Sequence, residues 1–247
     1  MKTTRAIHGF QVVEYPELDS TNSEAERLLS PELPDRTVVW TRRQTRGRGQ
    51  VGSHWESEPG KNLSLTLVLK PRELPAGEQF SLSMAVALGV HDFVSRHVEG
   101  CMIKWPNDIY VGDRKIAGIL IEHTIMGRHI YASLCGIGVN INQSLFNSDA
   151  PNPVSLVQLL GDELPVEQAL EELLHALAQR YRQVARTGML TRDYLGVLYR
   201  HGALHSWEDD SGHFQATLTG INEYGQLLLT DTAGRERVYG FKEVKYL

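Results

Sequence analysis

The sequence predicts an α+β protein in which a larger mixed domain is followed by a small β-module. Helical patterns alternate with strand-like runs over the first 200 residues. After Gly202 the chain changes to short runs separated by EYG and TAG turns, and about 45 residues of this kind suit a small barrel of SH3-like size. We therefore expect one domain at 1–200 and a second at 201–247, docked on the first because a unit this small is marginally stable alone.

Composition and charge are those of an ordinary globular protein. The 247 residues are 41% hydrophobic and 22% charged, with a net charge of −5, so nothing global indicates a nucleic-acid partner. No stretch has the length of a signal-peptide core or a membrane span, which favours a cytoplasmic location without membrane contact. Cys101 and Cys135 lie in apolar runs without CxxC spacing, so we expect buried free thiols and no metal site.

The first strand is expected at Phe10–Tyr15, and the polar stretch DSTN follows it. Ser20, Thr21 or Asn22 can cap a short helix, for which one such residue is enough. Three consecutive small polar side chains can also hold the polar head of a ligand. Both interpretations stay open on these residues alone.

The most unusual stretch is the basic loop, Thr41–Asn62, which lies between strand-like runs at 37–41 and 63–69. It carries four arginines among three glycines: Arg42, Arg43, Arg46 and Arg48 with Gly47, Gly49 and Gly52. Glycine permits close backbone approach to a ligand, and arginine binds carboxylate or phosphate with two parallel hydrogen bonds. The loop therefore suits a small acid, a nucleotide or both, with a solvated hairpin loop as the alternative.

The glycine spacing of this loop matches a dinucleotide-binding motif, but the context does not. A strand-like run follows the loop where that motif requires a helix, and no P-loop sequence is present. A nicotinamide site is therefore excluded. Trp55 can cover an apolar ligand or anchor the loop.

Three helices are expected beyond the loop. Apolar residues recur at three- and four-residue steps over Phe80–His97, which predicts a buried amphipathic helix. The clearest helical pattern runs over Leu164–Arg186, with Pro165 in its first turn, and another covers Leu190–Tyr199.

Between the first two helices, the stretch CMIKWPND predicts a strand that ends near Trp105, because proline cannot donate to a sheet. Asn107 and Asp108 suit a turn, and a hairpin follows. Lys104 and Lys115 flank this hairpin and can converge on one site, although lysines beside apolar strands often only extend toward water.

The run His129–Asn142 predicts a strand that ends in Gly136, Gly138, Asn140 and Asn142. Glycines within a strand suggest close approach by a ligand or by a second backbone. The asparagines suit recognition of a base edge or an amide. The turn-rich segment that follows, up to Leu156, is expected to be a lid or a plain surface loop.

Taken in order, these motifs resemble the bacterial biotin protein ligases. The motifs that carry the resemblance are DSTN (19–22), Q-x-x-GRG-x-x-G-x-x-W (44–55), KWPND (104–108), RKIAG (114–118), GIGVNIN (136–142) and the terminal β-module. The resemblance covers nearly the whole chain. It implies a mixed-sheet catalytic domain of the class II aminoacyl-tRNA-synthetase-like, biotin–lipoate ligase type, with an SH3-like barrel.

The resemblance also implies an activity. Biotin and MgATP would react to biotinyl-5′-AMP and pyrophosphate, and biotin would then pass to one lysine of a biotin carboxyl carrier protein. The chain would be a monomer or a homodimer, with Mg²⁺ needed alongside ATP. The alternatives are a lipoate–protein ligase and a non-catalytic biotin-binding or sensor protein.

Site residues follow from the same resemblance. It implies a biotin subsite formed by Ser20, Thr21, Asn22, Gln44, Arg48, Gly49, Gln50, Lys115 and Gly118. It implies an ATP and adenylate subsite formed by Arg46, Gly47, Arg48, Trp55, Lys104, Asn107, Asn140 and Asn142. The implied catalytic residues are Lys115, Arg48, Asp108 and Lys104.

Two departures from the pattern carry expectations of their own. Gln50 stands where many relatives have a second arginine, so we expect weaker retention of the adenylate. Only 18 residues precede Asp19, too few for a helix-turn-helix, so repression through DNA binding is not expected.

Overall fold

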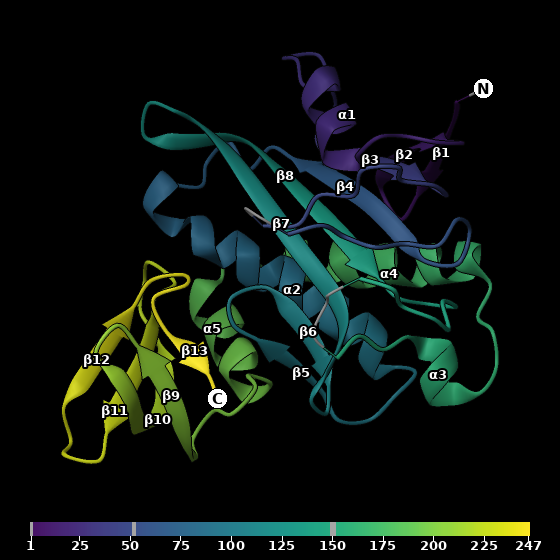
Figure 1. The fold of residues 1–247 in the computed structure, drawn as a ribbon. Coiled ribbons are helices and arrows are strands. Elements are labelled where there is room, and N and C mark those ends of the chain that lie inside the picture. Colours follow the sequence, from purple (N-terminus) through teal and green to yellow (C-terminus); the bar gives the residue numbers. More distant parts are fainter. Residues whose placement is uncertain (1, 51–52, 149–151) are drawn as a thin grey trace.

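A computed structural model describes residues 2–50, 53–148 and 152–247. Gly52 of the basic loop and residues 149–151 of the turn-rich segment lie outside these ranges. The described chain forms a large mixed α+β unit with a smaller β-module beside it (Figure 1), as the sequence predicts. The boundary near His201 stays a prediction. Within the described residues, no helix is long and apolar enough to cross a membrane.

The large unit is built on an eight-stranded sheet of order β1-β2-β3-β4-β8-β7-β6-β5. Strands β2 and β3 are parallel, and the other neighbouring pairs are antiparallel. The bounds are β1 Thr3–Ile7, β2 Phe10–Tyr15, β3 Thr37–Thr41, β4 Leu63–Leu69, β5 Cys101–Lys104, β6 Asp108–Val111, β7 Arg114–Met126 and β8 His129–Val139. Strand β1, which is mostly exposed, was not predicted.

Both faces of the central strands are covered, so β3 and β4 are buried along their whole length. Successive side chains of a strand point to opposite faces. Val39 and Val68 pack with Ala25 of helix α1 (Thr21–Leu28) on one face. Leu67 and Trp40 belong to the main core on the other face, where α2 (Gln79–Ser95) and α4 (Val166–Tyr181) lie (Figure 1).

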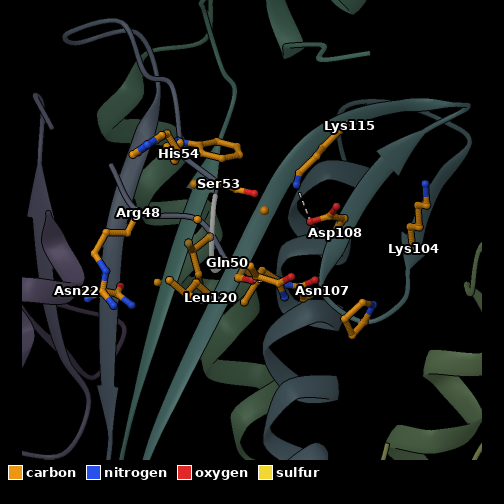
Figure 2. A pocket seen from close by; sticks show the side chains of 18 of the residues that line it. Asn22, Arg48, Gln50, Ser53, His54, Lys104, Asn107, Asp108, Lys115 and Leu120 are labelled. Atoms are coloured by element: carbon orange, nitrogen blue, oxygen red, sulfur yellow. Dashed lines mark hydrogen bonds and ion pairs between the residues drawn. The ribbon is translucent and has the colours of Figure 1, made fainter. Parts of the chain in front are cut away.

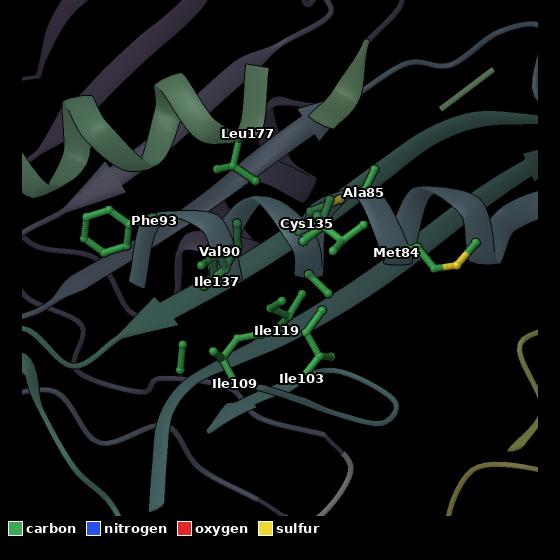
Figure 3. Close-up of a cluster of buried hydrophobic side chains, with 14 of the residues drawn as sticks. Met84, Ala85, Val90, Phe93, Ile103, Ile109, Ile119, Cys135, Ile137 and Leu177 are labelled. Carbon is green, nitrogen blue, oxygen red and sulfur yellow. The ribbon is translucent and has the colours of Figure 1, made fainter. Parts of the chain in front are cut away.

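Helix α2 is buried on nearly all sides, so the predicted amphipathic pattern is wrong for it. It packs between the sheet, α4 and α5 (Thr187–Gly196), as Figure 3 shows for part of this core. The contact with α4 is close, because a Cβ added at Gly89 would lie 2.8 Å from the Leu177 side chain.

The other helices differ from the sequence predictions in their ends. Helix α4 ends at Tyr181, five residues before the predicted end, and Pro165 is its N-cap residue. A short 3₁₀ helix, η1 (Ala76–Glu78), precedes α2. Helix α3 (Leu156–Leu160) was not predicted, although Ser155 and Gln158 form a capping box at its start.

The small module is a five-stranded antiparallel sheet of order β12-β11-β10-β9-β13. Its strands are β9 Leu204–Asp209, β10 Gly212–Ile221, β11 Leu227–Asp231, β12 Glu236–Tyr239 and β13 Lys245–Tyr246. The sequence predicts strands β10, β11 and β12, which lie on either side of the EYG and TAG turns. It misses β9 and β13, which are partly exposed and too short or too polar to show a pattern.

The module docks on the large unit through a buried contact. Trp105 Nε1 donates to the carbonyl oxygen of Gly225 at 2.8 Å. Gly225 has a φ of +80°, and a Cβ there would lie 2.2 Å from the Phe80 ring. Only glycine fits this junction, because any side chain would collide with the large unit.

Both cysteines are free thiols, as predicted. Cys135 is fully buried in the core and Cys101 is half-buried. Burial raises the pKa of the Cys101 thiol to about 11 and raises that of Cys135 still further. Both thiols are therefore neutral and unreactive at ordinary pH.

Arg180 joins three helices through a shared ion-pair network. Its guanidinium donates to Asp92 of α2 at 2.6 and 3.1 Å and to Asp193 of α5 at 2.7 Å. Burial opposes ionisation of Asp92, but hydrogen bonds from His91 and Arg180 outweigh it, and the pKa of this carboxyl is lowered.

We expect Arg180→Met to lower the free energy of unfolding by about 2 kcal/mol at pH 7, because two carboxylates lose their partner. A group with a lowered folded pKa contributes stability above its ordinary pKa of about 4 and loses it as pH falls through the folded value. The deficit should therefore shrink in urea titrations below pH 4. Arg192→Met is the control, since the exposed Arg192 lies 3.7 Å from Asp193. Equal losses in both variants would contradict the network.

Candidate active site

One pocket of about 630 Å³ lies where the start of α1, the basic loop, strands β6 to β8 and the end of the small module meet. Figure 2 shows it from close by. All residues expected for the biotin subsite line this pocket: Ser20, Thr21, Asn22, Gln44, Arg48, Gly49, Gln50, Lys115 and Gly118. Trp55, Lys104, Asn107 and Asp108 line it too.

Ser20 is the N-cap residue of α1 by position, yet its side chain makes no cap hydrogen bond. The cap interpretation of this side chain is therefore wrong. Its Oγ is buried and has no partner among the described residues. An unpaired buried hydroxyl is costly, so Ser20 at the pocket wall is suited to meet a polar ligand atom.

A hydrogen-bond chain holds the neighbouring polar side chains. Thr66 Oγ1 donates to Asn22 Oδ1 at 2.6 Å, and Asn22 Nδ2 donates to Glu122 Oε2 at 2.8 Å. The backbone N–H of Thr21 donates to Gln44 Oε1 at 2.8 Å, which ties α1 to the basic loop. This polar end of the pocket is therefore preorganised.

Glycines make the floor of the pocket. A Cβ at Gly136 would lie 2.2 Å from Asn22 Oδ1, and one at Gly138 would lie 2.2 Å from the Trp55 indole. The glycines were expected to leave room for a ligand or another backbone. In the structure two side chains, Asn22 and Trp55, pack against them. The Trp55 Nε1 is buried without a partner among the described residues.

Cations lie at both ends of the pocket, Arg48 beside Asn22 and the two lysines at the other end. Arg48 pairs with Glu122 at 2.6 Å, and Lys115 pairs with Asp108 at 2.7 Å. In Figure 2 Asp108 lies between Lys115 and Lys104. Both lysines line the pocket, as the convergence hypothesis requires, and burial lowers the pKa of the Lys104 ammonium.

Four expected site residues do not line the pocket: Arg46, Gly47, Asn140 and Asn142. Asn140 Nδ2 donates to the Val154 carbonyl, and Asn142 exchanges hydrogen bonds with the backbone of Leu164. These asparagines fasten the segment after β8, and their direct role toward a nucleotide stays a prediction.

Sequence reasoning missed Glu122, Thr66 and the contribution of the small module. Glu122 is the single carboxylate within the apolar run of β7, and a lone charge in such a run is a usable signal. Lys245 and Tyr246 of β13 also line the pocket, and this could not be predicted because their position depends on how the module docks.

No group of three or more His, Cys, Asp or Glu side chains that could hold a metal ion occurs among the described residues. Asp108 is the one carboxylate among the described residues that line the pocket.

Fold and pocket together define a protein with one pocket lined by uncharged polar side chains and by cations, which suits a ligand that carries both polar and anionic groups. Comparison with known proteins agrees with this class. The family model of the biotin/lipoate A/B protein ligase family matches residues 15–140. The chain belongs to this family.

Individual relatives extend the match. The chain is 32% identical over 229 residues to a biotin–[acetyl-CoA-carboxylase] ligase from Paracoccus denitrificans, covering 88% of this chain and 93% of that protein. It is 28% identical over 244 residues to the bifunctional ligase/repressor BirA of Bacillus subtilis, covering 94% and 73%. The fold matches biotin protein ligase from Aquifex aeolicus in complex with biotin and ATP, with a TM-score of 0.77, 22% identity and coverage of 96% and 99%.

We expect Gly138→Ala to displace the Trp55 indole, because the added methyl group would overlap it. Exposure of the indole should shift tryptophan emission to longer wavelength. In a Trp55→Phe background the same substitution should leave the emission unchanged. Gly188→Ala is the control, since nothing lies within 4 Å of a Cβ there. An unshifted spectrum in Gly138→Ala would contradict the packing.

Proposed function

We propose that this chain is an ATP-dependent biotin–protein ligase that forms biotinyl-5′-AMP and transfers biotin to a lysine of a biotin carboxyl carrier protein. The observation that carries the proposal is the polarity of the pocket. One end holds the buried, unpaired Ser20 hydroxyl together with Asn22 and Arg48, which both contact Glu122, and the other end holds Lys104 and Lys115. The near-full-length similarity to a biotin–[acetyl-CoA-carboxylase] ligase supports it.

Biotin fits this polarity better than lipoate does. The ureido ring of biotin carries N–H donors and a carbonyl acceptor, which Ser20, Asn22 and Gln44 can meet. The dithiolane ring of lipoate has no such groups and would leave buried polar atoms unpaired, which a site of this kind rejects. A cytoplasmic location is part of the proposal, since ATP is a substrate.

In the first half-reaction the biotin carboxylate attacks the α-phosphate of ATP, and pyrophosphate leaves. Carboxylate and phosphate repel each other, so fixed cations must hold them together and stabilise the charge that develops. Lys115 pairs with Asp108, and Arg48 pairs with Glu122. Substrate anions would take the place of these carboxylates as partners.

The residues present fit a magnesium ion that arrives with ATP. Mg²⁺ is usually bound by one or two carboxylates plus substrate phosphates, and Asp108 would supply the protein carboxylate. Bound there, the ion would neutralise phosphate charge.

In the second half-reaction the acceptor lysine attacks the carbonyl carbon of biotinyl-AMP, and AMP leaves. The attacking amine must be neutral, so a group that accepts its proton is needed. Asp108 is in place for this task once Lys115 turns to the substrate anions. The acceptor protein would be recognised at the mouth of the pocket.

We expect biotin to cause pyrophosphate release from MgATP in the absence of any acceptor protein. Lipoate should cause little release, because the polar side chains of Ser20, Asn22 and Gln44 suit a ring with polar atoms. Coupled phosphate detection measures both rates. Release with lipoate alone would move the assignment to a lipoate ligase, and release with neither would leave a binding protein.

We expect Lys115→Ala and Arg48→Ala each to slow biotin-dependent pyrophosphate release by about 10²-fold or more, since each removes a fixed charge at the reacting anions. Thermal unfolding should change little, because both side chains form partly exposed ion pairs. Arg114→Ala removes an exposed cation beside Lys115 and serves as the control. Wild-type rates in Lys115→Ala or Arg48→Ala would refute the roles.

A further inference from the structure

Lys104 is held differently from the other pocket cations. Lys115 and Arg48 each pair with a carboxylate, whereas Lys104 forms no ion pair within 4.0 Å in the part of the chain that the structure describes. Its Nζ donates a hydrogen bond to the Tyr110 hydroxyl at 3.4 Å and lies 4.7 Å from the ring centre of Tyr110, 4.8 Å from that of Tyr246 and 5.8 Å from that of Tyr199. We call these three rings the tyrosine cage.

The tyrosine cage is built from both units of the chain. Tyr110 belongs to β6, Tyr199 follows α5, and Tyr246 belongs to β13 of the small module. The ring centres of Tyr110 and Tyr199 lie 5.7 Å apart, and those of Tyr199 and Tyr246 lie 6.0 Å apart. The small module therefore completes one wall around a lysine of the large unit.

Tyr246 is fixed from its own side. It pairs with Trp207 across β9 and β13, and the two ring centres lie 4.6 Å apart. The next residue is tied back, because Arg200 donates to the Leu247 carbonyl at 2.7 Å. The ring is therefore presented to Lys104 by a rigid element.

The hydroxyl of Tyr246 does not explain its place. This oxygen is buried and has no hydrogen-bond partner among the described residues, whereas the ring face lies over an ammonium. An aromatic face attracts a cation without neutralising it. A carboxylate at this place would compete with the phosphates of a nucleotide, and an aromatic ring does not.

We propose that Tyr246 of the small module is a positioning residue that holds Lys104 as an uncompensated ammonium directed at the polyphosphate of ATP. The inference rests on the proposed function, because it assigns the anion that Lys104 meets. It gives the small module a part in nucleotide binding through one side chain.

The test compares Tyr246→Leu with the conservative Tyr246→Phe. Leucine keeps an apolar side chain but loses the aromatic face, and phenylalanine loses only the unpartnered hydroxyl. We expect KM for ATP to rise about fivefold or more in Tyr246→Leu, KM for biotin to stay within twofold, and Tyr246→Phe to restore wild-type behaviour. Tyr224→Leu removes an exposed aromatic of the same module and is the matched control.

A double-mutant cycle separates positioning from a structural role. If Tyr246 acts through Lys104, Tyr246→Leu should add no further defect to Lys104→Met. If Tyr246→Leu instead loosened the small module, it would raise KM for ATP both in wild-type protein and in Lys104→Met. Additive losses, or equal KM values for ATP in Tyr246→Leu and Tyr246→Phe, would overturn the inference.

The pH dependence gives an independent readout. Burial raises the pKa of Tyr110 to about 12 and raises those of Tyr199 and Tyr246, so the cage stays uncharged. Other charged groups that act on Lys104 are Asp108, Arg200, Lys115 and Asp113. The ring favours the ammonium, so its loss should lower the pKa of Lys104 and shift the alkaline fall in rate to lower pH in Tyr246→Leu than in Tyr246→Phe. Coincident profiles would contradict the proposal.

Failure of this inference is distinct from failure of the proposed function. If wild-type protein releases no pyrophosphate with biotin and ATP, the proposed function fails first. If wild-type protein is active and the Tyr246 variants behave alike, the function stands and the role of Tyr246 does not.

Discussion

The walls of the pocket depend on neighbouring strands that carry no side chains, because Asn22 and Trp55 pack against their bare backbone. Gly118 of β7 and Gly138 of β8 face each other across the sheet, and Gly136 lies two residues along the same face. A single methyl group at Gly136 or Gly138 would overlap Asn22 or Trp55. The polar start of α1, the basic loop and their hydrogen bonds are all arranged around this bare stretch of backbone.

The electrostatics of the pocket follow from the same arrangement. Arg48 is paired with Glu122, and Lys115 is paired with Asp108. Each ion pair is partly exposed, so it is weak and can be exchanged for a substrate anion at small cost. Lys104 differs from these two cations, because its ammonium lies against the rings of the tyrosine cage. The pocket is thus lined by cations that form an ion pair, such as Arg48 and Lys115, and by Lys104, which forms none within the described residues.

Much of this could be predicted from the sequence, and the failures have physical reasons. Strands β3 and β4 and the end of a strand near Trp105 follow from local patterns, whereas the lining by Ser20, Gln44 and Lys115 is implied by the family resemblance. The pairing of Asn22 with Glu122 joins residues far apart in sequence, and no local pattern reports it. The end of α4 was misjudged because apolar residues continue past Tyr181 while the backbone turns.

The part played by the small module could not be read from its short strands. Its sequence shows only a β-pattern, whereas its contribution depends on a docking contact at one glycine. Because Phe80 and Trp105 hold Gly225, the module cannot slide along the large unit. The predicted boundary between the two lies at the exposed residues 201–203. Loss of the contact at Gly225 would therefore part Tyr246 from Lys104 and take the tyrosine cage apart.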